Sequence, residues 1–279
     1  MGLKLIHSFN TKPFFINAYN VPQTTRMMGN IWYYALSLAY VKSFGASIEL
    51  HTDTLGKALL SSLPYDKIHL TLDSLPTDLH PRFWAAGKIW ALDASGPGVI
   101  HIDGDVFLKR SSLLEDIENS TWDFIGQSVE PTECYVNEGK SMFKSVGIDL
   151  ESIHGAYNTG VIGFRDPELL KEFTKSYKEK ALEISRKHGK TLESSSYLTP
   201  DLILEQYNAY RICEKRGANV KLILPQGLDI NEEAIRIGYQ HCLTCSKFSQ
   251  LDKCSETLKR VSPEIYNKIN KLCQSTLRK

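Results

Sequence analysis

The sequence predicts an α/β fold in which a mostly parallel central sheet is flanked by helices. Short apolar runs alternate with longer segments of helical periodicity, and strands that alternate with helices usually pair in parallel. Of the 279 residues, 42% are hydrophobic and 23% are charged, so the chain can bury a core of ordinary globular composition. We therefore expect one main domain, residues 1–245, and a short helical C-terminal appendage, residues 246–279, that packs on it.

Apolar runs and turn residues define the elements of the first hundred residues. Residues 3–9 and 99–102 are compact apolar runs of strand length. Residues 24–40 repeat apolar side chains at helical spacing, and Gly45 stops that helix. We expect strands at 3–9, 47–51, 67–72 and 99–102, separated by helices that begin at 24, 54 and 83.

The second half of the chain continues the alternation. The same patterns predict strands at 122–127, 159–164 and 220–224, with helices at 167–188 and 200–215. In the appendage, Pro263 opens a helix that places Ile265, Ile269 and Leu272 on one face.

Charge and targeting signals exclude several classes of function. The 33 Lys and Arg against 32 Asp and Glu leave a net charge of +1, which argues against nucleic acid as a partner. No apolar stretch reaches the roughly 18 residues of a membrane span, and the N-terminus lacks a signal-peptide core. The six cysteines are scattered in a chain that can fold without disulfides, so we expect a cytoplasmic, reducing location.

The most informative segment is the strand at 99–102, which runs directly into Asp103, Gly104 and Asp105. Ligands of α/β proteins bind at the carboxyl ends of strands, and strand alternation would place both carboxylates on one face. Two carboxylates this close repel each other and favour a hard cation, Mn²⁺ or Mg²⁺, that keeps positions open for phosphate oxygens. The segment therefore predicts a metal site for a diphosphate substrate. The alternative is a pair of solvated aspartates at the end of a strand.

This segment resembles the Asp-x-Asp motif of the GT-A glycosyltransferases, matched here by Asp103 and Asp105. The order of motifs is similar to that of the glycogenin-like members and of a group of uncharacterised bacterial proteins. The resemblance implies a GT-A (nucleotide-diphospho-sugar transferase) fold and a metal-dependent enzyme that moves a sugar from a nucleotide diphosphate sugar to an acceptor. It also implies that Lys88, on the preceding helix, meets donor phosphate. The alternative for Lys88 is a surface lysine on a packed helix.

A second match is the segment 157–164, which resembles the family's Asn-Ser-Gly segment before a buried strand. By this resemblance Asn158 hydrogen-bonds the donor sugar, since an amide can both donate to and accept from hydroxyls. Gly160 would let the backbone approach the ligand closely. The alternative is an ordinary turn asparagine before a strand.

A third match lies near the C-terminus, where glycogenin-like enzymes carry a His-to-Lys pair at the spacing of His241 and Lys247. The resemblance implies that His241 is the third metal ligand and that Lys247 holds the leaving diphosphate. This sequence departs from the family by having Thr244 where a glycine is usual, and Cys242 and Cys245 lie between the pair. These departures bear on Lys247 more than on His241.

The segment 199–206 is similar to the family's Asp-Gln segment, with Leu202 in place of the usual Gln. The resemblance implies that Asp201 hydrogen-bonds a sugar hydroxyl. If the enzyme inverts the anomeric centre, Asp201 or Glu205 would be the general base; a retaining enzyme needs none. Alternatively, Asp201 only complements the dipole of the helix that it opens.

The resemblance implies a glycan or lipid-linked glycan as acceptor. We expect residues 126–155 to shape the acceptor pocket, as loops at the edge of a sheet usually do. The appendage has an excess of basic residues and would allow peripheral contact with an anionic membrane, although such a run is more often a solvated helix face. Its basic residues include Lys253, Lys259, Arg260, Lys268, Lys271, Arg278 and Lys279.

Three other functions remain open. A haloacid dehalogenase-type phosphatase also places Asp-x-Asp after a buried strand, but it expects Thr or Val where Phe107 stands. A nucleotidyltransferase would need a glycine-rich basic loop after the first strand, which residues 10–13 do not supply. A non-catalytic binding module could instead hold structural Zn²⁺. Its ligands would be Cys242, Cys245, Cys254 and Cys273.

Overall fold

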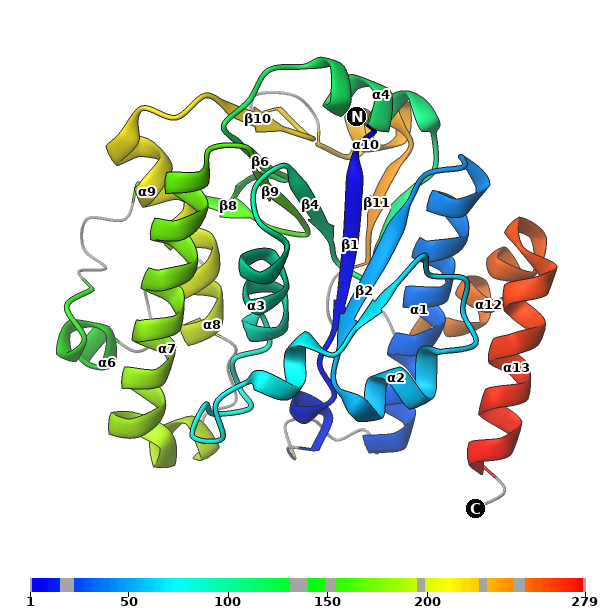
Figure 1. Cartoon of the computed structure of the whole chain (residues 1–279), viewed down its shortest axis with the longest axis horizontal. Coiled ribbons are helices and arrows are strands. Elements are labelled where there is room, and N and C mark those ends of the chain that lie inside the picture. The colour runs from blue at the N-terminus through cyan, green and yellow to red at the C-terminus, as the bar shows by residue number, and fades with distance from the viewer. Residues whose placement is uncertain are drawn as a thin grey trace. The chain divides into compact units, whose positions relative to one another are not determined.

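The computed structural model describes residues 2–15, 23–130, 140–148, 154–194, 199–225, 230–242 and 249–277 and confirms the predicted α/β class (Figure 1). Its main sheet has seven strands, in spatial order β10 (Val220–Leu222), β6 (Phe124–Gly126), β9 (Val161–Phe164), β4 (Val99–Ile102), β1 (Lys4–Phe9), β2 (Ile48–Thr52) and β3 (Ile68–His69). The pairings β1–β2, β2–β3 and β10–β6 are parallel, whereas β6–β9 is antiparallel. The sheet is therefore mostly parallel, as predicted.

The chain forms two compact units. Unit 1 consists of Met1–Asp73, His101–Ser120 and Asp229–Lys279, and unit 2 consists of Ser74–Ile100 and Thr121–Leu228. Each unit therefore combines segments that lie far apart in the sequence.

Unit 1 is built on β1, β2 and β3, with Leu5 paired to Ile48 and Phe9 to Thr52. A second, two-stranded sheet pairs β5 (Val106–Leu108) with β11 (Tyr239–His241) in antiparallel register. The helices of this unit are α1 (Gln23–Ser43), α2 (Thr54–Leu60), α4 (Ser111–Asn119), α10 (Ile230–Ile237), α12 (Leu251–Val261) and α13 (Pro263–Leu277).

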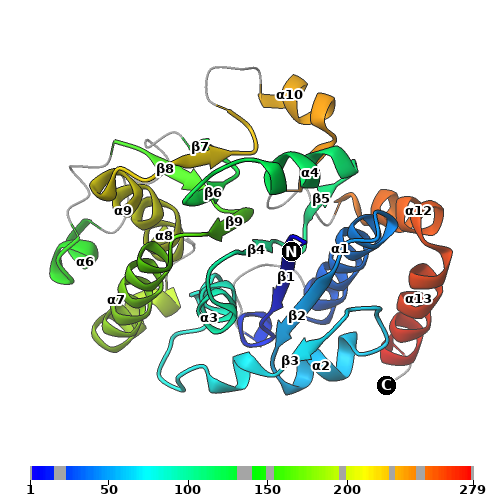
Figure 2. The same cartoon turned by 45° about the horizontal axis from the view of Figure 1, so that its top comes forward.

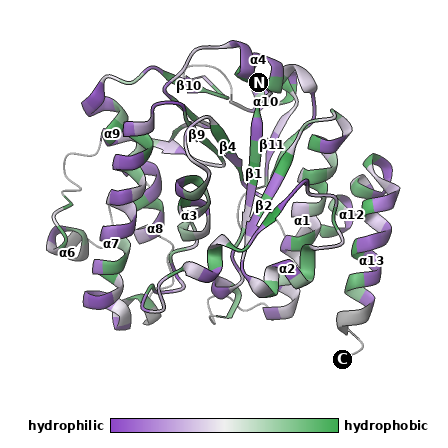
Figure 3. Ribbon diagram, viewed as in Figure 1, coloured by the Kyte–Doolittle hydropathy of each residue, from purple (hydrophilic) through white to green (hydrophobic). Residues whose placement is uncertain are grey.

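The two C-terminal helices, α12 and α13, pack against α1 (Figure 2). On α13 the predicted apolar face is present, because Ile265 and Ile269 are buried while Leu272 is half-buried. The ribbon of α13 accordingly alternates between apolar and polar residues (Figure 3). The basic helix opened by Pro263 is thus anchored through its apolar face.

The strand predicted at 67–72 is shorter than its apolar pattern suggests. β3 covers only two residues, and the chain then enters a 3-10 helix at Thr71–Ser74. The Asp73 carboxylate accepts from the amide and the hydroxyl of Thr54 at 2.9 and 2.7 Å, which binds this turn to the start of α2. Because this contact holds the 3-10 helix against the start of α2, the strand ends at His69.

Unit 2 combines strands β6, β9 and β10 with a two-stranded antiparallel sheet of β7 (Ser128–Glu130) and β8 (Ala156–Asn158). Asn158, for which the alternative was an ordinary turn asparagine, is the last residue of β8. The helices of this unit are α3 (Ala86–Ser95), α6 (Lys140–Ser145), α7 (Pro167–Ser194), α8 (Thr199–Leu202), a π-helical turn η3 (Ile203–Tyr207) and α9 (Asn208–Arg216).

Three predicted helices differ in detail from the structure. The helix expected from residue 83 begins at Ala86. The helix predicted at 167–188 is α7, which has a non-helical residue at His188 and continues to Ser194. The helix predicted at 200–215 is interrupted by η3 and ends at Gly217, whose φ of 61° is the left-handed conformation that glycine favours at a helix end. None of the described helices is both long and apolar enough to cross a lipid bilayer.

Candidate metal centre

The segment from Asp103 to Asp105 is a tight turn between two strands. β4 ends at Ile102, the amide of Val106 donates to the carbonyl of Asp103 over 3.0 Å, and β5 begins at Val106. The expectation that strand alternation aligns the two carboxylates was wrong, because the chain turns at Gly104. The turn itself brings both carboxylates into one cluster of potential metal ligands.

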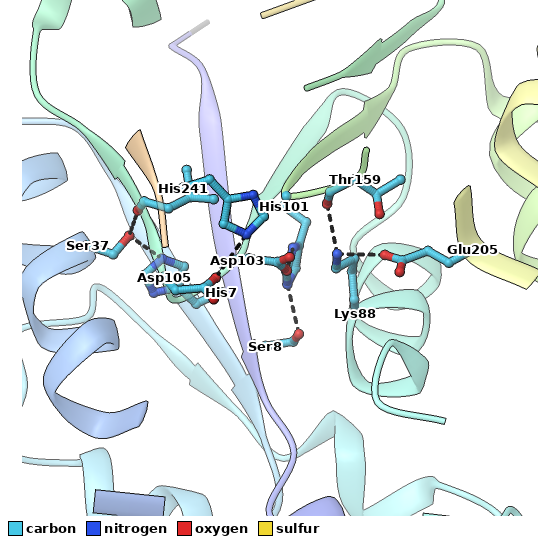
Figure 4. A network of polar contacts seen from close by, with 12 residues as sticks. His7, Ser8, Ser37, Lys88, His101, Asp103, Asp105, Thr159, Glu205 and His241 are labelled. Atoms are coloured by element: carbon cyan, nitrogen blue, oxygen red, sulfur yellow. Dashed lines mark hydrogen bonds and ion pairs between the residues drawn. The ribbon is translucent and has the colours of Figure 1, made fainter. Parts of the chain in front are cut away.

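The third member of this cluster, His241, is placed by the β5–β11 ladder. His241 pairs with Val106, and the amide of the next residue, Cys242, donates to the Asp105 carbonyl over 3.0 Å. The His241 Nε2 atom lies 3.4 Å from Asp105 Oδ1. Ligand atoms of Asp103, Asp105 and His241 all lie within 4.8 Å of one another (Figure 4). The structure therefore brings together the three predicted metal ligands.

Two of the three potential ligand side chains are nearly buried. The Asp103 side chain is 29% exposed, whereas the side chains of Asp105 and His241 are 10% and 8% exposed. A cation would stabilise two neighbouring carboxylates in this partly buried cluster, since burial and their mutual repulsion both disfavour the charged forms. Two oxygens and one imidazole nitrogen form a donor set that suits Mn²⁺ or Mg²⁺.

A buried histidine that the sequence did not reveal lies close to this cluster. The Ser37 hydroxyl donates to the Val106 carbonyl over 2.7 Å, so His7 Nε2 must donate to the Ser37 oxygen, 3.1 Å away. His7 Nδ1 then accepts from the Tyr65 hydroxyl at 2.9 Å. Burial lowers the pKa of His7 to about 3 despite the opposing charge of Asp105. His7 is thus neutral at pH 7 and does not balance the negative charge of Asp105.

A second histidine supports the other carboxylate. His101 Nδ1 lies 3.6 Å from Asp103 Oδ1, and its Nε2 atom lies 2.8 Å from the Ser8 hydroxyl (Figure 4). The hydroxyl of Tyr34 donates to the carbonyl of the same serine. His101 is buried, so its ring has a fixed orientation beside Asp103.

The glycine of the turn packs directly against Tyr34. A Cβ atom added at Gly104 would lie 2.2 Å from the Tyr34 ring, which its hydroxyl holds to Ser8. We expect Gly104→Ala to lower the free energy of unfolding by about 1–3 kcal/mol, because the ring or the turn must shift. Urea denaturation of the metal-free protein measures this change.

Gly189 is the matched control for that substitution, since a Cβ added there meets nothing within 4 Å. Gly189→Ala should be neutral or slightly stabilising. In a Tyr34→Ala background the effect of Gly104→Ala should largely disappear. An unchanged effect in that background would contradict the packing explanation.

In unit 2, Lys88 lies in a buried ionic cluster rather than on the surface. Its ammonium lies 2.6 Å from Glu205 Oε1 and donates to the Thr159 carbonyl over 2.8 Å (Figure 4). The side chains of Lys88 and Glu205 are 7% and 6% exposed. The reading of Lys88 as a surface lysine was therefore wrong. The lysine links α3 to the β8–β9 turn and to η3.

Asp201 belongs to the same buried region of unit 2. Its carboxylate accepts from the Ala85 amide at 2.6 Å and from the Tyr177 hydroxyl at 2.5 Å. Asp201 thus holds Ala85, the residue directly before α3, in place. Its role is therefore more than complementing a helix dipole. Burial, followed by the charge of Glu205, raises the pKa of Asp201 to about 7.

This raised pKa predicts a pH dependence of stability. Folded Asp201 retains its proton between the ordinary aspartate pKa of about 4 and the folded value of about 7, a range in which the unfolded chain has lost it. The contribution of Asp201 to stability therefore falls as the pH rises through this window. Asp201→Asn should gain stability relative to wild type from pH 4 to pH 7 in urea denaturation. A constant difference between the two proteins would contradict the assigned pKa.

Asn158 and Gly160 form a local turn. The Asn158 side-chain oxygen accepts from the Gly160 amide at 3.0 Å, and its Nδ2 atom donates to Glu130 at 2.8 Å. Both groups of the amide therefore have partners within unit 2. Glu130, which sequence reasoning missed, holds the amide in place.

Some predicted residues lie outside the described part of the chain. These are Lys247, Thr244, Cys245, Arg278 and Lys279, together with parts of the predicted acceptor segment 126–155. Among the described residues, no cysteine forms a disulfide, and none belongs to a group of three potential metal ligands. The four-cysteine zinc site therefore has no support in the described residues.

The sequence profile of a family of unknown function (DUF6734) matches residues 4–272. No curated protein matches the sequence significantly. The matched range includes the Asp103–Asp105 turn, His241 and the Lys88 cluster.

Proposed function

The chain belongs to the DUF6734 family, whose function is unknown, and we propose that it is a metal-dependent glycosyltransferase using a nucleotide diphosphate sugar. The observation that carries this proposal is the convergence of Asp103, Asp105 and His241 within 4.8 Å. The Asp-x-Asp resemblance and the mostly parallel sheet support it. The finer assignment to the GT-A fold is part of the same proposal.

The chemistry of the donor set fits the metal that the proposal requires. Asp103 and Asp105 supply hard oxygen ligands, and His241 offers Nε2 beside Asp105. Three protein ligands leave further positions of Mn²⁺ or Mg²⁺ for phosphate oxygens. When bound, such a cation neutralises the charge that develops on the leaving nucleotide diphosphate.

The chain's own residues prepare the ligands. Neutral His7 anchors β1 to α1 through Ser37, whose hydroxyl holds the first residue of β5. His101 lies beside Asp103 and contacts Ser8 on β1. Because these supports are buried, the ligands need little reorganisation to bind a cation.

The roles of the other predicted site residues rest on the resemblance. We propose that Lys88 and Lys247 bind donor phosphate and that Asn158, Gly160 and Asp201 bind the donor sugar. An amide held by Glu130 and a lysine held by Glu205 are fixed in orientation, as recognition of a ligand requires.

The acceptor in this proposal is a glycan or a lipid-linked glycan. Two lysines of the C-terminal helices already have partners within the chain. Lys268 lies 2.7 Å from Glu264, and Lys259 lies over the Tyr266 ring. Contact of this region with an anionic membrane stays a prediction.

A thermal-shift panel of nucleoside diphosphates, each with and without Mn²⁺, tests the function. We expect at least one diphosphate to raise the melting temperature only when Mn²⁺ is present, because a ligand that binds the folded state stabilises it. The matching nucleoside monophosphate should have little effect. If no diphosphate stabilises the protein with either Mn²⁺ or Mg²⁺, the proposal fails.

A further inference from the structure

A second cluster of potential metal ligands lies in unit 1, on β2 and β3. Glu49 and His51 are two residues apart on β2 and therefore point to the same face of the sheet. His69 on β3 is the register partner of His51. Ligand atoms of the three side chains all lie within 4.8 Å of one another. The strand register, rather than chance contact of mobile side chains, brings them together.

The contacts of this cluster orient the imidazoles. The rings of His51 and His69 stack with centroids 4.5 Å apart. His51 Nδ1 lies 2.8 Å from the Thr71 hydroxyl, and this contact helps to orient the ring. Such a partner on the second ring nitrogen is usual for histidines that bind metals.

The other two ligands have room to adjust. His69 Nε2 lies 2.6 Å from Glu49 Oε2, and their side chains are 25% and 16% exposed. Metal bonds of about 2.0–2.2 Å separate the ligands of a tetrahedral ion by roughly 3.3 Å. A small rotation of these partly exposed side chains would therefore admit an ion, with water in the fourth position.

We propose that Glu49, His51 and His69 form a second metal site, selective for Zn²⁺ and similar nitrogen-binding divalent ions over Mg²⁺. Two imidazoles and one carboxylate are a common ligand set of zinc, whereas Mg²⁺ prefers oxygen ligands. The bound ion would cross-link β2 to the two-residue strand β3. This site is separate from the Asp103–Asp105–His241 centre in ligands and in preferred metal.

Lys4 competes with the proposed ion. Its ammonium lies 3.1 Å from Glu49 Oε2 and is 43% exposed. Zn²⁺ binding would displace this cation toward solvent, so the lysine should weaken the affinity. Removing its charge should therefore leave zinc binding intact or tighten it.

Calorimetric titration of the full chain with Zn²⁺ tests the proposal. The chain used carries Asp105→Asn, which weakens metal binding at the first centre. We expect one Zn²⁺ to bind in the presence of excess Mg²⁺, and Co²⁺ to give the visible absorption of a four-coordinate site. His69→Gln should weaken Zn²⁺ binding by about a hundredfold or more, whereas Lys4→Met should not weaken it.

His69 is partly exposed, so His69→Gln should fold, and its melting temperature without metal verifies this. In the presence of Asp105 the same variant should keep any Mn²⁺-dependent stabilisation by nucleoside diphosphates, which separates this site from the proposed function. Absence of Zn²⁺ binding in the Asp105→Asn background, or equal binding by folded His69→Gln, would overturn the second site.

Discussion

Asp105→Asn is expected to abolish the stabilisation of the protein by Mn²⁺ and a nucleoside diphosphate. The substitution removes one of two charged oxygen ligands while keeping the shape of the side chain, so the Mn²⁺ affinity should fall by about a hundredfold or more. The backbone carbonyl that binds the Cys242 amide is unaffected. Sugar transfer or hydrolysis of the donor should be lost with the metal.

The same variant should have normal or increased stability without metal, because it relieves repulsion between the carboxylates of Asp103 and Asp105. Asp252→Asn is the matched control, since Asp252 lies exposed in the first turn of α12. The control should bind Mn²⁺ as wild type does. Undiminished Mn²⁺-dependent binding of a diphosphate by folded Asp105→Asn would remove the metal assignment.

Lys88→Met is expected to cause the largest loss of stability. The variant leaves Glu205 without its 2.6 Å partner in a site where both side chains are less than a tenth exposed. Removing one member of a buried ion pair costs about 3–5 kcal/mol, because the other charge stays buried without compensation. Urea denaturation at neutral pH measures the loss.

Two comparisons make this prediction specific. Lys175→Met removes a 3.9 Å ion pair with Glu179 whose side chains are more than 60% exposed, so it should change stability by at most about 1 kcal/mol. The double variant Lys88→Met/Glu205→Gln should be more stable than Lys88→Met alone, since it also removes the orphaned charge. A double variant that loses the sum of the two single effects would show that the pair is not coupled.

The features of the site that depend on neighbouring residues in the sequence could be predicted. The apolar strand before Asp103 and the glycine between the aspartates can be read directly, and they predicted the paired carboxylates. His241 was predicted only by resemblance, because β5 and β11 have three residues each and are too short to show a periodic pattern. The ladder that brings His241 to Asp105 depends on pairing between distant segments.

Long-range polar contacts account for most of what sequence reasoning missed. His7 lies within an apolar strand and carries no local sign that it binds Ser37 and Tyr65. The partner of Lys88 could not be predicted, because α3 and η3 meet only in the folded unit. The stacked pair of His51 and His69 likewise requires the β2–β3 register.

Pulsed electron paramagnetic resonance of bound Mn²⁺ in the presence of a nucleoside diphosphate tests the central claim most directly. The metal should show coupling both to an imidazole nitrogen and to phosphate phosphorus, and His241→Gln should lose the nitrogen coupling. The same spectrum should be unchanged in His69→Gln. A Mn²⁺ signal without phosphorus coupling, or a nitrogen coupling that persists in His241→Gln, would contradict a nucleotide-binding metal centre at Asp103, Asp105 and His241.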